Sequence, residues 1–206
     1  MTILFVDGWL GPEAGDWQEL WARKLPGSVR VEQDDWRFAE RDPWIARLDE
    51  AIASCAEPPV LVAHSLGCLA VAHWAAKGPE RPVRAALMVT PADVERNPTA
   101  EIVGFDPIPR RAFPFKTIVV ASQNDRWMSP ERALSFATSW GARVVDAGEV
   151  GHMTVRGGYG PWPEGERFLD DLLDPEPLGR TGARTLSPSP RPVSVTMSPW
   201  STRAAC

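Results

Sequence analysis

The chain has few of the features that mark several large classes of protein. Its 206 residues include only 3 cysteines, at positions 55, 68 and 206, an odd number that lacks the spacing of a metal site. This usage predicts reduced thiols rather than a disulfide framework. No apolar run reaches the length that crosses a bilayer, so we expect no membrane partner.

Positive charge is also in the minority. The chain has 22 Lys and Arg against 27 Asp and Glu, which gives a net charge of −5. No basic run alternates with aromatic residues, and this argues against a nucleic-acid partner. The segment Met1 to Asp7 has no basic stretch and reaches an acid too early for a signal peptide, which predicts a cytoplasmic protein.

Histidine is scarce, whereas apolar residues are plentiful. The only histidines are at positions 64, 73 and 152, so there are few candidates for a catalytic base. The chain is 44% hydrophobic and carries 10 tryptophans, enough for one sizeable domain with its own core. We expect most of the tryptophans to be packing residues.

Short apolar runs alternate with amphipathic segments as far as residue 173. Strands are expected near residues 2–6, 29–32, 59–63, 84–89, 116–121 and 143–146, and helices near 17–25, 43–52, 66–77, 130–140 and 162–173. Alternation of this kind is typical of an α/β fold with helices on both faces of a parallel sheet. The sequence therefore predicts a three-layer α/β/α sandwich around a roughly six-stranded, mainly parallel sheet. The proline-rich connection over residues 90–115 is too short for a large lid.

The composition changes at residue 174. Residues 174–206 are rich in Pro, Ser, Thr and Arg and contain few large apolar side chains. Such a segment buries too little surface to offset the entropy lost on ordering. We therefore divide the chain into a domain over residues 1–173 and a disordered C-terminal tail over residues 174–206.

A predicted strand that ends in a serine is the strongest functional signal. The segment Ala63-His64-Ser65-Leu66-Gly67 is close to the Gly-x-Ser-x-Gly pattern of a nucleophile elbow, a tight turn that presents a serine above the carboxyl edge of a sheet. Small residues two places before and after the serine let the strand and helix backbones approach each other. Ser65 is therefore the candidate nucleophile.

A serine hydroxyl needs a base and an acid to become an effective nucleophile, and in this fold they follow in the order serine, acid, histidine. His152 lies in a glycine-rich loop after the last predicted strand and is the candidate base. Asp125 follows the strand over residues 116–121 and is the candidate acid. Asp93 and Asp106 are weaker alternatives for the acid.

The other two histidines have less suitable positions. His73 lies about two turns into the helix that follows Ser65, which places it below the reacting centre and predicts a structural role. His64 adjoins the serine, and its side chain is expected to point away from the hydroxyl. A packing or hydrogen-bonding role in the elbow is the expectation for His64.

The remaining candidates surround the serine. An oxyanion hole needs two backbone N–H groups, and the fold takes one from the residue after the nucleophile and one from the loop after the first strand. Leu66 and Trp9 are the predicted donors, and Gly8 allows the sharp turn before Trp9. Trp9, Trp127 and Met128 flank the catalytic loops and predict an apolar substrate pocket.

Together these segments resemble the small YdeN-like serine hydrolases, the α/β-hydrolase group that includes retinoblastoma-binding protein nine. The resemblance covers residues 1 to about 173 and rests on Gly8-Trp9, Asp16-Trp17-Gln18, the elbow at Ser65, Asn124-Asp125 and Gly151-His152. It implies a single-domain hydrolase with a Ser65-Asp125-His152 triad, no cofactor, no metal, and activity on small ester or amide substrates.

Two functions are compatible with these observations. The first is a serine hydrolase, carboxylesterase-like or acting as an aminopeptidase or amidase, that takes short or medium acyl groups through an acyl-enzyme. The second is a non-catalytic protein-binding module built on the same fold. An acid and a histidine that follow Ser65 in the order expected of this fold favour the enzyme, because a binding module needs neither.

Overall fold

Six parallel strands form the centre of the molecule. The computed structural model describes residues 1–78 and 80–173, so the predicted tail over residues 174–206 lies outside the described residues. The sheet order is β2-β1-β4-β5-β7-β8, and every neighbouring pair is parallel. The strands are β1 (Ile3–Val6), β2 (Ser28–Arg30), β4 (Val60–His64), β5 (Ala85–Val89), β7 (Lys116–Ala121) and β8 (Arg143–Asp146).

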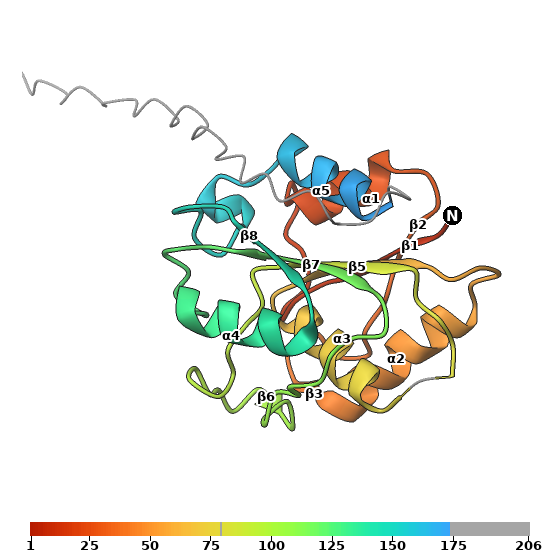
Figure 1. Cartoon of the computed structure of the whole chain (residues 1–206), viewed down its shortest axis with the longest axis horizontal. Helices are drawn as coiled ribbons and strands as arrows, with labels where there is room; N and C mark the ends of the chain where they lie inside the picture. Colours follow the sequence, from red (N-terminus) through yellow and green to blue (C-terminus); the bar gives the residue numbers. More distant parts are fainter. Residues whose placement is uncertain (79, 174–206) are drawn as a thin grey trace, which may run out of the picture.

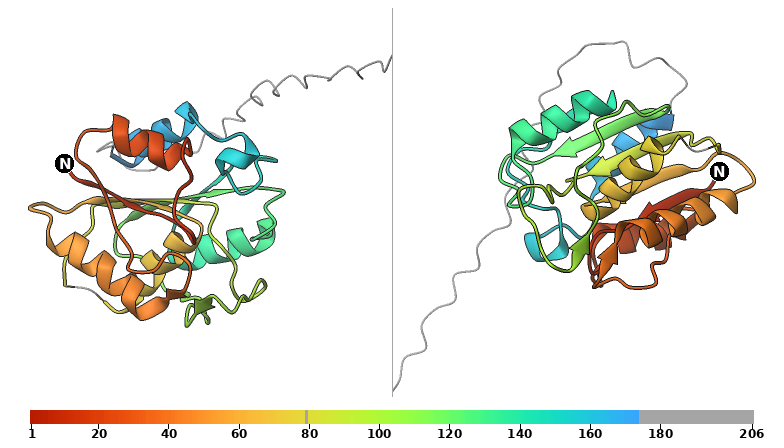
Figure 2. Two further views of the ribbon diagram at one scale, coloured as in Figure 1. Left: turned by 180° about the vertical axis from the view of Figure 1, so that it is seen from behind. Right: turned by 90° about the horizontal axis from the view of Figure 1, so that it is seen from below.

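Helices cover both faces of this sheet. One face carries α1 (Trp17–Lys24) and α5 (Pro163–Leu173), and the other carries α2 (Arg41–Ala53), α3 (Leu66–Ala76) and α4 (Pro130–Trp140), as Figures 1 and 2 show. The predicted three-layer α/β/α sandwich is therefore confirmed. Within the described part of the chain, each helix is too short or too polar to span a bilayer.

Local sequence explains why these elements begin and end where they do. At α4, the hydroxyl of Ser129 accepts a hydrogen bond from the backbone N–H of Arg132 at 3.4 Å, and Pro130 occupies the first turn. Gly141 ends the helix in the left-handed conformation, with φ of 69°. These two caps explain why the observed bounds of α4 agree with the helix predicted over residues 130–140.

The central strands are apolar along their whole length because both of their faces are covered. All five residues of β4 and all five of β5 are buried. Leu61 and Ala63 pack into the core on one face, whereas Val60 and Val62 pack into the core on the other. Because both faces are buried, the sequences of β4 and β5 are continuous apolar runs and do not alternate between apolar and polar residues.

Three short elements were not predicted from the sequence. β3 (Ala39–Glu40) and β6 (Ile102–Val103) pair in parallel as a separate two-stranded sheet, and η1 (Val155–Gly157) is one turn of 3-10 helix. Two residues are too few to produce a recognisable pattern. β6 lies within the connection over residues 90–115, which therefore forms part of the main body and not a separate lid.

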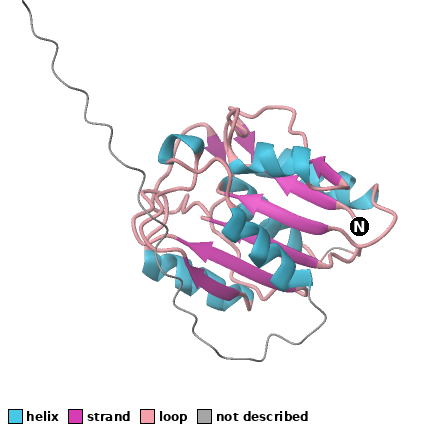
Figure 3. Ribbon diagram, turned by 90° about the horizontal axis from the view of Figure 1, so that it is seen from above, coloured by secondary structure: helices cyan, strands magenta, loops and turns pink. Residues whose placement is uncertain are grey.

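Backbone strain gathers at one edge of the sheet. Because the strands are parallel, their carboxyl ends point to the same edge, where many loops gather (Figure 3). Four non-glycine residues of the described chain have positive φ, and each follows a strand of this sheet: Leu10, Ser65, Thr90 and Met153. Such conformations are uncommon for residues other than glycine and often mark functional sites.

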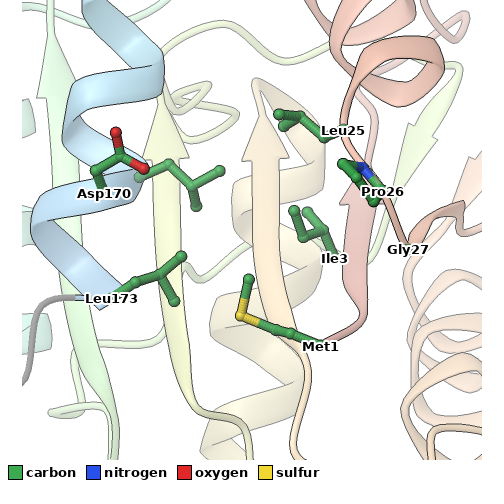
Figure 4. A pocket seen from close by; sticks show the side chains of 8 residues that line it. Met1, Ile3, Leu25, Pro26, Gly27, Asp170 and Leu173 are labelled. Atoms are coloured by element: carbon green, nitrogen blue, oxygen red, sulfur yellow. The ribbon is translucent and has the colours of Figure 1, made fainter.

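A pocket of about 470 Å³ lies away from this edge (Figure 4). It is lined by residues near the start of β1, just after α1 and in the last turns of α5, namely Met1, Ile3, Leu25, Pro26, Gly27, Leu169, Asp170 and Leu173. Because Met1 and Ile3 lie at the amino end of β1, the pocket is at the opposite end of that strand from the strained loops.

The first turn of α3 lies against the end of β1. A Cβ atom added to Gly67 would lie 2.0 Å from the carbonyl oxygen of Val6 and 2.7 Å from that of Asp7. Both neighbours are backbone atoms, one in the last residue of β1 and one in the residue that follows it, so neither can move independently of the sheet. Position 67 therefore requires glycine, as the elbow pattern implies.

Gly67→Ala is expected to lower the free energy of unfolding by about 3 kcal/mol or more, since the new methyl group overlaps immobile backbone. Urea denaturation measures the change. Gly157→Ala is the control, because its Cβ would meet nothing closer than 3.9 Å, and it should shift stability by less than about 0.5 kcal/mol. Equal stabilities for the two variants would contradict the close approach.

Candidate active site

Ser65 lies in a strained turn between β4 and α3. Its φ is 53° and its ψ is −119°, and its backbone N–H donates to the carbonyl oxygen of Val89 at 3.1 Å. Every other residue from 60 to 75 is buried, whereas Ser65 keeps intermediate exposure. The turn therefore brings one polar side chain of a buried segment to the surface, as a nucleophile elbow does.

His152 connects this serine to a carboxylate. Its Nε2 lies 2.8 Å from Ser65 Oγ, and its Nδ1 lies 2.8 Å from Asp125 Oδ2. A carboxylate only accepts, so Nδ1 carries the hydrogen and Nε2 is free to accept from the serine hydroxyl. The structure thus brings the three residues together in one hydrogen-bonded chain, from loops that follow β4, β7 and β8.

Asp125 is held firmly in this position. Its side chain is only 2% exposed, and its second oxygen, Oδ1, accepts the backbone N–H of Trp127 at 2.8 Å. The alternative acids lie elsewhere: Asp93 forms a two-point ion pair with Arg132, at 2.6 and 2.7 Å, and Asp106 is exposed. Asp125 is the carboxylate in contact with His152.

His64 and His73 are both buried and both bonded to backbone. His64 Nε2 lies 2.9 Å from the carbonyl oxygen of His152, and His73 Nε2 lies 2.9 Å from that of Phe105. Burial, together with the nearby His152, lowers the pKa of His64 to about 3. Both histidines therefore lie inside the protein and contact backbone carbonyl groups.

The histidine loop, residues 151–155, has further side-chain partners on its backbone. Trp17 Nε1 donates to the carbonyl oxygen of Met153 at 3.0 Å, and Asn124 Oδ1 accepts the N–H of Gly151 at 2.6 Å. Asp16 accepts the N–H of Val155. We did not identify these contacts from the sequence, although Asp16, Trp17 and Asn124 all lie in segments that carry the family resemblance.

Asp16 lies at the start of α1 but does not cap it. An aspartate just before a helix is typical of an N-cap, and Asp16 does occupy that position before α1. Its side chain makes no capping hydrogen bond, because its two oxygens accept the N–H groups of Glu13 and Val155 instead. It therefore links α1 to the histidine loop.

The loop after β1 lies against the serine. A Cβ on Gly8 would come within 2.8 Å of Ser65 Cβ and 3.3 Å of its Oγ, so the Gly8–Trp9 backbone adjoins the hydroxyl. Leu66 is buried as the first residue of α3, whose amino end carries partial positive charge. The predicted oxyanion donors, Trp9 and Leu66, thus belong to the two segments beside Ser65.

One tryptophan, Trp127, lies next to His152, and a second, Trp9, lies next to Trp127. The rings of Trp9 and Trp127 meet edge to face at 6.5 Å between centroids, and Trp127 lies 6.3 Å from the His152 ring. Met128 has a different location, since it is 3% exposed and packs in the core cluster that includes Phe136. Of the three residues predicted to line the substrate pocket, Trp9 and Trp127 therefore remain candidates for contact with a substrate.

Asp7 precedes the Gly8–Trp9 loop and carries a buried carboxyl group. It is 2% exposed, and Oδ2 lies 2.6 Å from Nε of Arg30. Burial raises the pKa of Asp7 from 3.8 to about 6, and the charge of Arg30 offsets only part of that effect. The native state therefore holds this proton more tightly than the unfolded chain does.

Comparison with known proteins gives one family match and several similar structures. Residues 3–171 match the family model described as serine hydrolase. A YdeN-like hydrolase from Pectobacterium atrosepticum is 32% identical, with 83% of this chain and 89% of that chain covered and a TM-score of 0.75. Comparison with curated proteins gave no significant match.

More distant structures share the fold. The ydeN gene product of Bacillus subtilis is 16% identical over 84% of this chain and 98% of that chain, with a TM-score of 0.66. An α/β-hydrolase from the metagenome of Mar Chica lagoon sediments is 15% identical, covers 84% and 90% of the two chains, and also has a TM-score of 0.66.

Asp7→Asn is expected to change how stability depends on pH. Because the folded pKa is raised, the stability that Asp7 contributes is complete below about pH 4 and is lost as the pH rises through 6. The variant should gain up to about 3 kcal/mol relative to wild type between pH 4 and 7. Urea denaturation across this range measures the difference.

Asp170→Asn, at an exposed carboxylate of α5, is the matched control and should follow the wild-type profile. Parallel pH profiles for Asp7→Asn and wild type would show that the Asp7 carboxyl does not have a raised pKa in the folded protein.

Proposed function

The chain belongs to the serine hydrolase family, and we propose that it cleaves small ester or amide substrates through a covalent acyl-enzyme on Ser65. The observation that carries this proposal is the continuous chain of hydrogen bonds from Asp125 through His152 to Ser65, both at 2.8 Å. Three residues from separate loops meet in the order that nucleophilic catalysis requires.

In the first step Ser65 Oγ attacks the substrate carbonyl carbon. His152 Nε2 takes the hydroxyl proton as the new bond forms, and the ring becomes a cation. Asp125 stabilises this cation through Nδ1 and fixes the orientation of the ring. The carboxylate is buried and already accepts the N–H of Trp127, so it needs little reorganisation.

The carbonyl oxygen becomes an oxyanion in the same step. We assign its stabilisation to the backbone N–H groups of Trp9 and Leu66, which belong to the two segments beside Ser65. As the intermediate collapses, His152 returns its proton to the leaving alcohol or amine. Water then attacks the acyl-enzyme with the same base, releasing the carboxylic acid and restoring the Ser65 hydroxyl.

Trp9 and Trp127 supply the apolar surface beside the reacting atoms. The Trp127 ring lies 6.3 Å from the His152 ring, and Trp9 meets Trp127 edge to face at 6.5 Å, which suits an apolar acyl or leaving group. The connection over residues 90–115 contains the short strand β6 and forms no separate lid. An open site of this kind favours short or medium acyl groups over long ones.

A fluorophosphonate probe should label the wild-type protein and fail to label Ser65→Ala, because the probe requires an activated serine. Ser54→Ala, at an exposed serine just after α2, should be labelled like wild type. Labelling that survives in Ser65→Ala would exclude Ser65 as the nucleophile. An inert wild-type protein would favour a binding module instead.

Asp125→Asn should lower kcat for a p-nitrophenyl ester by about 10³- to 10⁴-fold, with KM little changed, since it removes the acceptor that fixes the His152 tautomer. Asp93→Asn is the control: because Asp93 pairs with Arg132, this variant can change stability but should leave kcat close to the wild-type value. Equal kcat values for Asp125→Asn and wild type would contradict the assignment of the acid.

A series of p-nitrophenyl esters should give the highest kcat/KM with short or medium acyl chains. Because Trp9 and Trp127 form an open apolar surface, affinity should rise over the first few methylene groups and then level off. Aminoacyl arylamides in the same assay separate esterase from aminopeptidase activity. A maximum at long acyl chains would contradict the open site.

A further inference from the structure

The carbonyl groups of the histidine loop accept hydrogen bonds from side chains on other elements. His64 Nε2 lies 2.9 Å and Thr90 Oγ1 lies 3.4 Å from the carbonyl oxygen of His152, and Trp17 Nε1 lies 3.0 Å from that of Met153. We propose that His64 and Trp17 are positioning residues, which hold the His152 ring at its working distance from Ser65. This inference rests on the proposed function.

The chemistry of the contact determines how His64 acts. A carbonyl oxygen can only accept, so His64 Nε2 must carry the hydrogen and donate it. His64 is the last residue of β4 and directly precedes Ser65. One residue thus joins the backbone of the nucleophile to the backbone of the base, 88 positions apart in the chain.

Burial keeps His64 suited to this task. The residue is 6% exposed, and the same burial that lowers its pKa to about 3 keeps the ring neutral near neutral pH. The His64 and His152 rings lie 5.0 Å apart between centroids. A charged ring at position 64 would oppose the cation that forms on His152 during the reaction, whereas a neutral ring can donate without that penalty.

The backbone that these donors hold is itself strained. Met153, whose carbonyl oxygen accepts from Trp17, has a φ of 49°. Such conformations persist only where surrounding contacts determine them. Removing a donor therefore allows the histidine loop to relax, and the first consequence is a change in where the His152 ring lies.

Trp17 has little freedom to move. It is fully buried, and its ring meets Trp21, Trp162 and His64 edge to face, at centroid distances of 5.0, 5.2 and 5.9 Å. Its N–H is therefore fixed toward the carbonyl oxygen of Met153. His64 and Trp17 thus act on two successive carbonyl groups from a rigid part of the core.

His73 provides a matched control within the same segment of chain. It also makes a 2.9 Å contact from Nε2 to a backbone carbonyl oxygen, and it is also buried, but its partner is Phe105. Substitutions at positions 64 and 73 remove the same type of bond. Only the bond of His64 holds the backbone of the base.

The test measures the rate of fluorophosphonate labelling, together with kcat and KM for a p-nitrophenyl ester, at a temperature where each variant is folded. His64→Leu should be slower than wild type by about 10- to 100-fold in labelling and in kcat, with KM little changed. His64→Gln, whose amide N–H can replace Nε2–H, should recover most of that loss. His73→Leu should stay within about 3-fold of wild type.

Each result has a definite meaning. Wild-type rates in His64→Leu, or equal losses in His64→Leu and His73→Leu, would overturn the positioning role while leaving Ser65 as nucleophile. An unlabelled wild-type protein would instead contradict the proposed function. If His64→Leu does not fold, Trp17→Phe removes one N–H and keeps an aromatic ring: a several-fold loss of kcat supports the proposal, and an unchanged kcat overturns it.

Discussion

The tight turn at Ser65 is the constraint on which the rest of the site depends. Its positive φ, and the glycine two residues later, let α3 start against the end of β1. The same close approach puts the Gly8 backbone beside the serine hydroxyl. A wider turn would separate the serine from the loop after β1, and the predicted oxyanion donor would lose its place.

The parallel sheet supplies the other partners. Because neighbouring strands end at the same edge, loops that are far apart in sequence meet there: Ser65 follows β4, Asp125 follows β7 and His152 follows β8. His152 is held from two sides, by Asp125 at its ring and by His64 at its carbonyl oxygen, and Trp17 holds the carbonyl oxygen of the next residue, Met153. In the proposed mechanism, this arrangement fixes the base before a substrate arrives, which is how preorganisation lowers a barrier.

Much of this could be predicted from the sequence, and the reason is physical. Fully buried strands give continuous apolar runs, and glycine and proline mark their ends, so the bounds of β7 and α4 agree with the prediction. The three proposed catalytic residues could be selected from the sequence because each follows a predicted strand. β3 and β6 were missed because two residues carry no pattern, and the contact of Trp17 with Met153 was missed because it joins positions 136 residues apart. Met128 was assigned to the pocket from its place beside Trp127, but neighbours in a loop need not point the same way.

The most direct measurement of the central claim is the position of the covalent adduct. Wild-type protein is treated with a fluorophosphonate, digested, and its peptides are mapped by mass spectrometry. The account predicts a single adduct on the peptide that contains Ser65, located at the serine itself. An adduct on any other residue, with Ser65 unmodified, would contradict it.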